Sequence, residues 1–184
     1  DLLARMHANT PIPKAIGTTR QYELTGDKRL QQVASYLWER VALHRSYAIG
    51  GHSDDELFFP IAHFDQHLSS VTAETCNTYN MLKLTRKLFA LEPDAKYAEF
   101  HERALFNHIL GSIDPGDGST CYMVPVGMGV QREYQGMFQS FTCCVGSGME
   151  SHALHGDGAT CEGQQSGRRE LAKAYPKVSA HGLT

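Results

Sequence analysis

The feature that most constrains the fold of this 184-residue chain is a pattern of helical segments that meet in pairs across very short breaks. The first pair meets at the tripeptide Thr25-Gly26-Asp27, and the second pair meets at Pro93-Asp94. Two helices that are joined by so few residues lie antiparallel, as a helical hairpin. The pattern therefore predicts a mainly α-helical domain that is built from hairpins.

The first hairpin has a start signal and a stop signal in its sequence. One helix is expected over residues 11–24, because prolines suit a first turn and Gly26 suits the residue after a helix end. The next helix is expected to begin at Asp27, which is a favourable N-cap. Its apolar residues recur in steps of three and four, which predicts one buried face. These residues are Leu30, Val33, Ala34, Leu37, Trp38, Val41 and Ala42.

The second hairpin is expected to contain a helix over residues 72–90 and a helix that starts from Asp94. The spacing of apolar residues again predicts one buried face on each helix. The residues expected to be buried are Tyr79, Leu82, Leu84, Leu88 and Phe89 in the first helix, and Tyr97, Phe100, Ala104, Leu105, His108 and Ile109 in the second.

Long irregular segments cover residues 46–71 and 113–148. The second is expected to contain a short strand over 120–126, within a strand or β-hairpin insertion near 119–142. Long loops inside a compact domain are usually functional. Residues 159–184 are rich in Gln, Gly, Arg and Lys and have weak apolar periodicity. They are predicted to form an atypical tail that packs poorly or does not belong to the domain.

The composition excludes several classes of protein. Hydrophobic residues make up 41% of the chain and charged residues 20%, which is ordinary for a globular protein. The formal net charge of −3 argues against a nucleic-acid or anionic-membrane partner, which would favour a basic surface. No apolar run approaches the roughly 20 residues that span a bilayer. The chain begins at Asp1 with no methionine and no signal-peptide pattern, so we expect its native N-terminus to be missing.

The cysteines are odd in number and form no Cys-x-x-Cys pair, so they do not indicate a small disulfide scaffold. Glu74 and Cys76 open the third helix, and both can reach one point if Glu74 lies just outside it. Cys143 and Cys144 precede a further helix that is expected from about Met149. One carboxylate and three thiolates would satisfy a tetrahedral zinc ion. On these residues alone, a first-turn acid beside buried packing thiols remains the alternative.

Three further side chains are candidates for contact with a sugar. Glu56 ends a glycine-containing loop, and a glycosidase needs an acid that protonates the leaving oxygen. A solvated loop acid is the alternative for Glu56, and the preceding Asp54 and Asp55 are expected to face solvent or to cap the next segment. His7 stands in a polar run ahead of the first helix, and Tyr122 offers a hydroxyl and a flat ring. An ordinary cap or packing role is the alternative for both.

Taken in order, these segments resemble glycoside hydrolase family 127, the family of β-L-arabinofuranosidases. A glutamate two residues before a cysteine, joined to a later Cys-Cys-x-Gly, is a specific combination. The matching blocks follow the family order over residues 5–158. They are His7-Ala8-Asn9-Thr10 with Pro13-Lys14, Gly50-Gly51 with Glu56, Glu74-Thr75-Cys76-Asn77 with Tyr79-Asn80-Met81, the stretch from Glu102 to His108, and Cys143-Cys144 with Gly146-Ser147-Gly148.

The resemblance implies that residues 1–158 form part of a toroid of six α-hairpins, with the site in its central cavity. It also implies that Cys143 is the nucleophile and Glu56 the general acid/base, and that His7 and Tyr122 bind the substrate. The side chains that correspond to Zn²⁺ ligands in the family are Glu74, Cys76, Cys143 and Cys144.

The implied activity is retaining hydrolysis that releases β-L-arabinofuranose, or a related sugar, from an arabinose-containing oligosaccharide or plant-type glycan. Two alternatives from other classes stay open. One is a non-catalytic helical module with a structural zinc, since four protein ligands with no open position are the usual structural pattern. The other is a thiol redox protein that uses Cys143 and Cys144. Reduced thiolates favour a cytoplasmic location, although metal-bound thiolates also survive elsewhere, and the sequence leaves the oligomeric state open.

Overall fold

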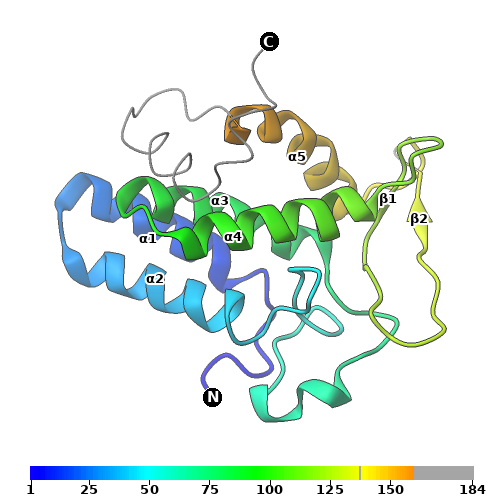
Figure 1. Ribbon diagram of the computed structural model, residues 1–184, viewed down its shortest axis with the longest axis horizontal. Coiled ribbons are helices and arrows are strands. Elements are labelled where there is room, and N and C mark those ends of the chain that lie inside the picture. The colour runs from blue at the N-terminus through cyan, green and yellow to red at the C-terminus, as the bar shows by residue number, and fades with distance from the viewer. Residues whose placement is uncertain (137, 160–184) are drawn as a thin grey trace.

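The computed structural model describes residues 1–136 and 138–159, and the predicted tail lies outside this part from residue 160 onward. The two predicted hairpins are present and pack against each other (Figure 1). They consist of α1 (Pro11–Thr25) with α2 (Lys28–Ala42), and of α3 (Thr75–Leu91) with α4 (Ala95–Ala104). The prediction of a mainly helical domain is therefore confirmed.

The caps that were expected from the sequence form as hydrogen bonds in the first hairpin. Gly26 follows α1 with a φ of 70°, and its N–H donates to the carbonyl of Tyr22. A left-handed residue directly after a helix favours glycine, because glycine has no Cβ to clash there. The carboxylate of Asp27 then accepts from the N–H of Arg29 and caps α2. The reversal is thus encoded locally by two adjacent residues.

The remaining elements lie after the second hairpin or between the two. The helix α4 continues as a π-helical turn and then as a 3-10 turn, and a two-stranded antiparallel sheet lies near the predicted insertion. These elements are η1 (Ile61–Gln66), η2 (Leu105–Ile109), η3 (Leu110–Ser112), β1 (Thr120–Cys121), β2 (Tyr134–Gln135) and α5 (Cys143–Ala159).

The main core joins the two hairpins around Trp38. Its indole is fully buried, packs edge-on against the rings of Tyr97 and Phe100, and donates to the hydroxyl of Thr85 at 2.7 Å. The prediction of the buried face of α2 is confirmed at Ala34, Trp38, Val41 and Ala42. The prediction is wrong at Val33, which is 58% exposed. An amphipathic helix covers only a limited arc, and Val33 falls outside the arc that α1 and α3 cover.

Three predicted boundaries are also wrong. The third helix begins at Thr75 rather than at residue 72, because Ala73 has a φ of 55° that no helix accommodates. The strand predicted over 120–126 pairs only at Thr120 and Cys121. The last helix begins at Cys143 and includes Gly146-Ser147-Gly148, which were expected to precede it. A Cβ on Gly148 would lie 3.1 Å from Thr120 Cγ2, so close packing against β1 favours glycine within this helix.

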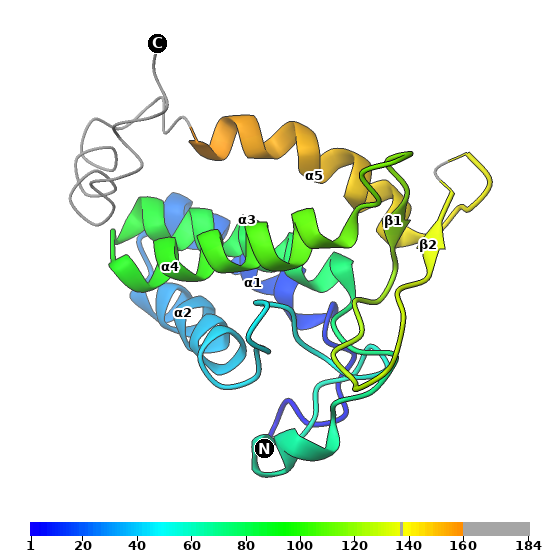
Figure 2. The same ribbon diagram turned by 45° about the vertical axis from the view of Figure 1, so that its right-hand side comes forward.

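The loops gather at one end of the helical layer. The N-terminal ends of α3 and α5 lie there, beside the small sheet and the segment that precedes α3 (Figure 2). Isolated β-bridges connect these loops, including His7 with Leu57 and Glu74 with Met123. Segments that are far apart in the sequence therefore meet around the first turns of α3 and α5.

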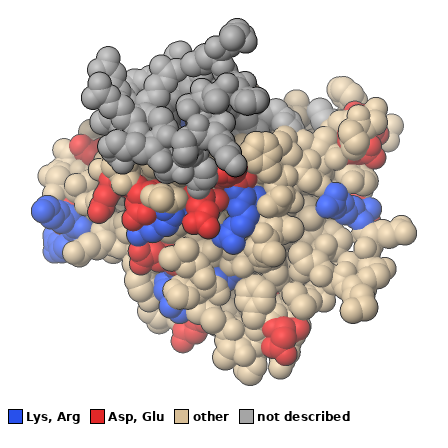
Figure 3. Space-filling model, viewed as in Figure 1, with Lys and Arg blue, Asp and Glu red and all other residues tan. Residues whose placement is uncertain are grey.

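The surface has no long stretch of one charge in the view of Figure 3, where acidic and basic side chains are interspersed over the hairpins. Within the described part of the chain, no helix is both long and apolar enough to cross a membrane.

Candidate active site and metal centre

Glu74 and Cys76 reach one point because Glu74 is the N-cap of α3 rather than part of the helix. Its backbone is extended, with φ −56° and ψ 128°, while Cys76 lies in the first helical turn. The preceding Ala73 is in a left-handed conformation, and its carbonyl accepts from His108 Nε2 at 3.0 Å. Glu74 therefore lies just outside the helix, as a ligand position shared with Cys76 requires.

The first turn of α5 brings two further sulfur atoms to the same point. Cys144 Sγ lies 3.3 Å from Cys76 Sγ and 3.9 Å from Glu74 Oε1. Cys143 Sγ lies 3.7 Å from Glu74 Oε1 and 3.8 Å from Cys144 Sγ. One ligand atom from each of the four residues lies within 4.8 Å of the others. Sulfur atoms around a tetrahedral zinc ion are about 3.7 Å apart, so the spacing fits such an ion.

The four residues differ in their access to solvent. Glu74, Cys76 and Cys144 are at most 4% exposed, whereas Cys143 is exposed. Because Cys143 is the one exposed residue of the cluster, it is the member that a substrate can contact.

Burial disfavours the charged forms of groups in the cluster. Burial raises the pKa of Glu74, and the nearby charge of Glu56 raises it further. Burial also raises the pKa of the Cys143 thiol, although the hydrogen bond between Cys143 and Tyr122 opposes this. The hydrogen bond to Cys76, together with burial, raises the pKa of Cys144. Glu74 Oε2 is buried with no hydrogen-bond partner among the described residues. A divalent cation would favour the charged forms of these groups, so the donor set fits zinc.

Glu56, Tyr122 and His7 lie beside the exposed sulfur. The hydroxyl of Tyr122 donates to Glu56 Oε1 and lies 3.4 Å from Cys143 Sγ. His7 Nδ1 accepts from the N–H of Asn9, which leaves Nε2 to face Glu56 Oε2 at 3.4 Å. Burial and the hydrogen bonds with Cys143 and Glu56 raise the pKa of Tyr122, which keeps it a neutral donor. The structure thus brings the predicted catalytic, substrate and metal residues together on one connected face.

The backbone of Glu56 is in a conformation that its side chain disfavours. Asp54 and Leu57 exchange both N–H···O bonds at 3.0 Å across the two residues between them. Those residues, Asp55 and Glu56, have φ values of 47° and 64°. Positive φ at both central positions is the type I′ pattern, in which glycine is favoured at the second position. Each such residue costs on the order of 1 kcal/mol, and this strain projects the Glu56 carboxylate toward Tyr122.

We expect the free energy of unfolding of the Glu56→Gly variant to be about 1 kcal/mol higher than that of the Glu56→Ala variant. Both variants lose the carboxylate and its hydrogen bonds, so the comparison isolates the cost of a Cβ at positive φ. Urea denaturation of the two proteins measures the difference. Equal midpoints with equal slopes would mean that the turn is not strained at this position.

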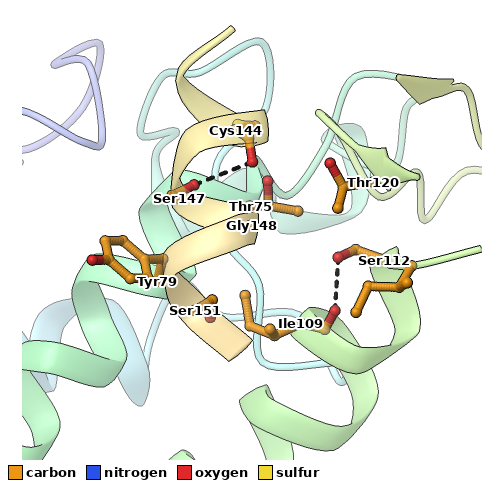
Figure 4. A pocket seen from close by; sticks show the side chains of 10 residues that line it. Thr75, Tyr79, Ile109, Ser112, Thr120, Cys144, Ser147, Gly148 and Ser151 are labelled. Carbon is orange, nitrogen blue, oxygen red and sulfur yellow. Dashed lines mark hydrogen bonds between the residues drawn. The ribbon is translucent and has the colours of Figure 1, made fainter. Parts of the chain in front are cut away.

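Ser147 is a neighbour of the cluster to which no role was assigned from the sequence. Its Oγ lies 3.1 Å from Cys76 Sγ and donates to the carbonyl of Cys144. Its place in the block Gly146-Ser147-Gly148 was the only available signal. Figure 4 shows it on a small pocket behind Cys144, together with Thr75 and Thr120. None of Glu56, Tyr122 and His7 lines this pocket, so it is not the face from which Cys143 is reached.

Two of the many histidines are structural. His108 is fully buried, with Nδ1 bonded to Thr78 Oγ1 and Nε2 to the carbonyl of Ala73. His52 is fully buried with its ring stacked on Phe58, and neither of its ring nitrogens has a partner among the described residues.

Comparison with known proteins places this site in a family. Residues 1–157 match the sequence profile described as the β-L-arabinofuranosidase GH127 catalytic domain. A non-reducing end β-L-arabinofuranosidase of Bifidobacterium longum subsp. longum is 27% identical over 109 residues, which are 59% of this chain and 16% of that protein.

Solved structures with the same fold include members of two glycosidase families. A GH127 β-L-arabinofuranosidase from Geobacillus stearothermophilus T6 superposes with a TM-score of 0.62 at 24% identity, over 82% of this chain and 26% of that one. An inactive variant of the GH76A α-1,6-mannanase of Salegentibacter sp. HEL1_6 superposes with a TM-score of 0.60 at 19% identity, over 96% of this chain and 48% of that one. The chain thus spans about a sixth of the curated relative and about a quarter of the GH127 structure. It belongs to glycoside hydrolase family 127 and has the fold of part of an (α/α) toroid.

Proposed function

We propose that this site performs retaining hydrolysis of terminal β-L-arabinofuranosides, with Cys143 as nucleophile and Glu56 as general acid/base. The proposal also assigns a zinc ion to Glu74, Cys76, Cys143 and Cys144. The observation that carries it is the position of Cys143 Sγ. This sulfur belongs to the ligand cluster, comes from its one exposed residue, and is linked to Glu56 through the hydroxyl of Tyr122.

The substrate class follows from the family and its relatives. The matching family and the Bifidobacterium relative are both described as β-L-arabinofuranosidases. An arabinose-containing oligosaccharide or glycan is therefore the proposed substrate, and the sugar enters from the face that exposes Cys143. His7 and Tyr122 would bind its hydroxyl groups there, because both offer hydrogen-bonding atoms beside Glu56.

The residues of the chain account for both steps of the proposed reaction. Bound zinc would supply the positive charge that keeps Cys143 a thiolate at neutral pH. The Cys143 sulfur forms a bond to the anomeric carbon while Glu56 gives its proton to the departing oxygen, and the C–O bond breaks. Glu56 then takes a proton from water, which attacks the same carbon and breaks the C–S bond. Two inversions at one carbon give net retention.

Hydrolysis of p-nitrophenyl β-L-arabinofuranoside, followed by proton NMR, tests this function. We expect release of p-nitrophenol, with β-L-arabinofuranose as the first anomer to appear before mutarotation. The α anomer as first product would exclude a cysteinyl intermediate. No hydrolysis by zinc-loaded protein would exclude the proposed activity.

A structural zinc site is the second candidate, and the burial of three of the four ligands favours it. The Glu56→Gln variant separates the two. A catalytic site would lose hydrolysis of substrates with poor leaving groups and keep its zinc, because Glu56 is not a ligand. Under the structural alternative the wild-type protein holds zinc and hydrolyses nothing.

A further inference from the structure

The turn that presents Glu56 is held by a closed ring of hydrogen bonds outside the metal cluster. Ser69 Oγ donates to Asp54 Oδ1 at 2.5 Å and accepts from the N–H of Val71 at 3.1 Å. The carbonyl of Val71 accepts from the N–H of Asp55, the residue between Asp54 and Glu56. The side chain of Asp54 therefore closes a ring around its own turn.

The second oxygen of Asp54 joins the same turn to a fixed imidazole. Asp54 Oδ2 lies 2.7 Å from His67 Nδ1. The His67 ring is stacked on Phe59, with centroids 4.4 Å apart and planes 13° apart, and its carbonyl accepts from Tyr47 Oη. Because His67 is fixed on two sides, it is a rigid anchor for Asp54. The expectation that Asp54 faces solvent is wrong, since only 19% of its side chain is exposed.

The bonds of Asp54 to His67 and Ser69 matter because the turn holds two non-glycine residues in a disfavoured backbone conformation. Asp55 and Glu56 both have positive φ, and neither is glycine. Without a fixed flank, such a turn relaxes toward conformations with negative φ, which would swing the Glu56 carboxylate away from Tyr122. Strain of this kind persists only where the surrounding structure over-determines it.

We propose that Asp54 is a positioning residue for Glu56. Its two carboxylate oxygens tie the strained turn to His67 and Ser69, and this keeps the Glu56 carboxylate in place beside Tyr122 and Cys143. The proposal deepens the proposed function, because the value of a fixed Glu56 rests on its role as acid/base. The anchoring itself does not rest on that role and is measurable without substrate.

The test compares Asp54→Ala with Asp54→Asn and with Asp65→Ala, a matched control at an exposed carboxylate of the same loop. Hydrogen exchange is followed by NMR at the amides of Asp55, Leu57 and Ala8, whose N–H groups bond to Val71, Asp54 and Glu56. We expect Asp54→Ala to lower their protection by about tenfold or more, with protection in α3 unchanged. Asp54→Asn should restore most of it, because its amide oxygen can accept from Ser69 and its amide nitrogen can donate to a ring nitrogen of His67.

Activity and zinc content separate this proposal from the proposed function. In Asp54→Ala, zinc content should match wild type, KM should change little, and kcat should fall. The fall should be about tenfold greater for an alkyl β-L-arabinofuranoside than for the p-nitrophenyl glycoside, because a poor leaving group depends more on the proton from Glu56. Unchanged amide protection in Asp54→Ala would overturn the positioning role, whether or not the protein is active. If Asp54→Ala lowers the amide protection but the wild-type protein hydrolyses neither substrate, the anchoring role stands and the proposed function is refuted. An equal fall in kcat for both substrates would mean that Asp54 has a general structural role and does not position Glu56.

Discussion

Replacing Cys143 by alanine is expected to lower kcat for p-nitrophenyl β-L-arabinofuranoside by about 10⁴-fold or more, the scale on which loss of a nucleophile acts. Cys143 is the exposed sulfur of the cluster and the one that contacts Tyr122. Glu56 and Tyr122 remain in the variant, yet the described part of the chain has no other exposed thiol that can form the bond to the anomeric carbon. Steady-state kinetics on protein of known zinc content measure the loss.

Cys121→Ala is the matched control for this substitution. Cys121 is fully buried in β1, and burial raises the pKa of its thiol to about 11, so it stays neutral and unreactive. We expect its loss to leave kcat within about threefold of wild type, as for a small truncation away from the chemistry. A Cys143→Ala protein that binds zinc and keeps kcat within tenfold of wild type would show that another group attacks the sugar.

The second large effect is a loss of stability in mild acid. Burial lowers the pKa of His52 to about 3 and that of His108 to about 4, from an ordinary value of 6.5. As the pH falls below 6.5, these histidines bind protons in the unfolded chain but stay neutral in the folded protein, so the folded state loses stability. The loss continues until the pH reaches the folded pKa values of about 4 and 3. Between pH 7 and pH 5 each histidine should contribute a loss of about 2 kcal/mol.

His52→Leu tests the share of one histidine. The ring nitrogens of His52 have no partner in the described part of the chain, so leucine removes the protonation site without stranding a hydrogen-bonding group. We expect the free energy of unfolding of this variant, measured by urea denaturation, to fall by about 2 kcal/mol less than that of wild type between pH 7 and pH 5. Groups such as Glu74 titrate in both proteins and cancel in the comparison. Parallel pH profiles for the two proteins would show that His52 is not buried in its neutral form.

The parts of the fold that were predicted correctly are those that are encoded by local signals. Gly26 and Asp27 determine the reversal between α1 and α2 whatever surrounds them, because each acts on the helix end next to it. The start of α5 was missed for the opposite reason. Three residues of poor helix propensity, Gly146-Ser147-Gly148, lie inside it, and of the two glycines only Gly148 packs closely against Thr120.

The convergence of the four cluster residues was predictable through the family resemblance and not through spacing. Glu74 and Cys76 come from the start of α3, whereas Cys143 and Cys144 come from the start of α5, and no local pattern indicates that these helix ends meet. The ring around Asp54 was missed because its members lie in an irregular loop, where side-chain bonds do not follow a sequence period. The left-handed φ of Glu56 was also unpredictable, since the residue contradicts the turn rule that would have revealed it.

The most direct test of the central claim is the zinc content of the purified protein, measured by elemental analysis for wild type and for Glu74→Ala, Cys76→Ser and Cys144→Ser. Cys121→Ser is the control, because Cys121 lies outside the cluster. The four-ligand site predicts one tightly held zinc per chain in wild type and in the control, and its loss in each of the other three variants. A folded wild-type protein without zinc, or zinc that persists in all three ligand variants, would contradict the proposed metal centre.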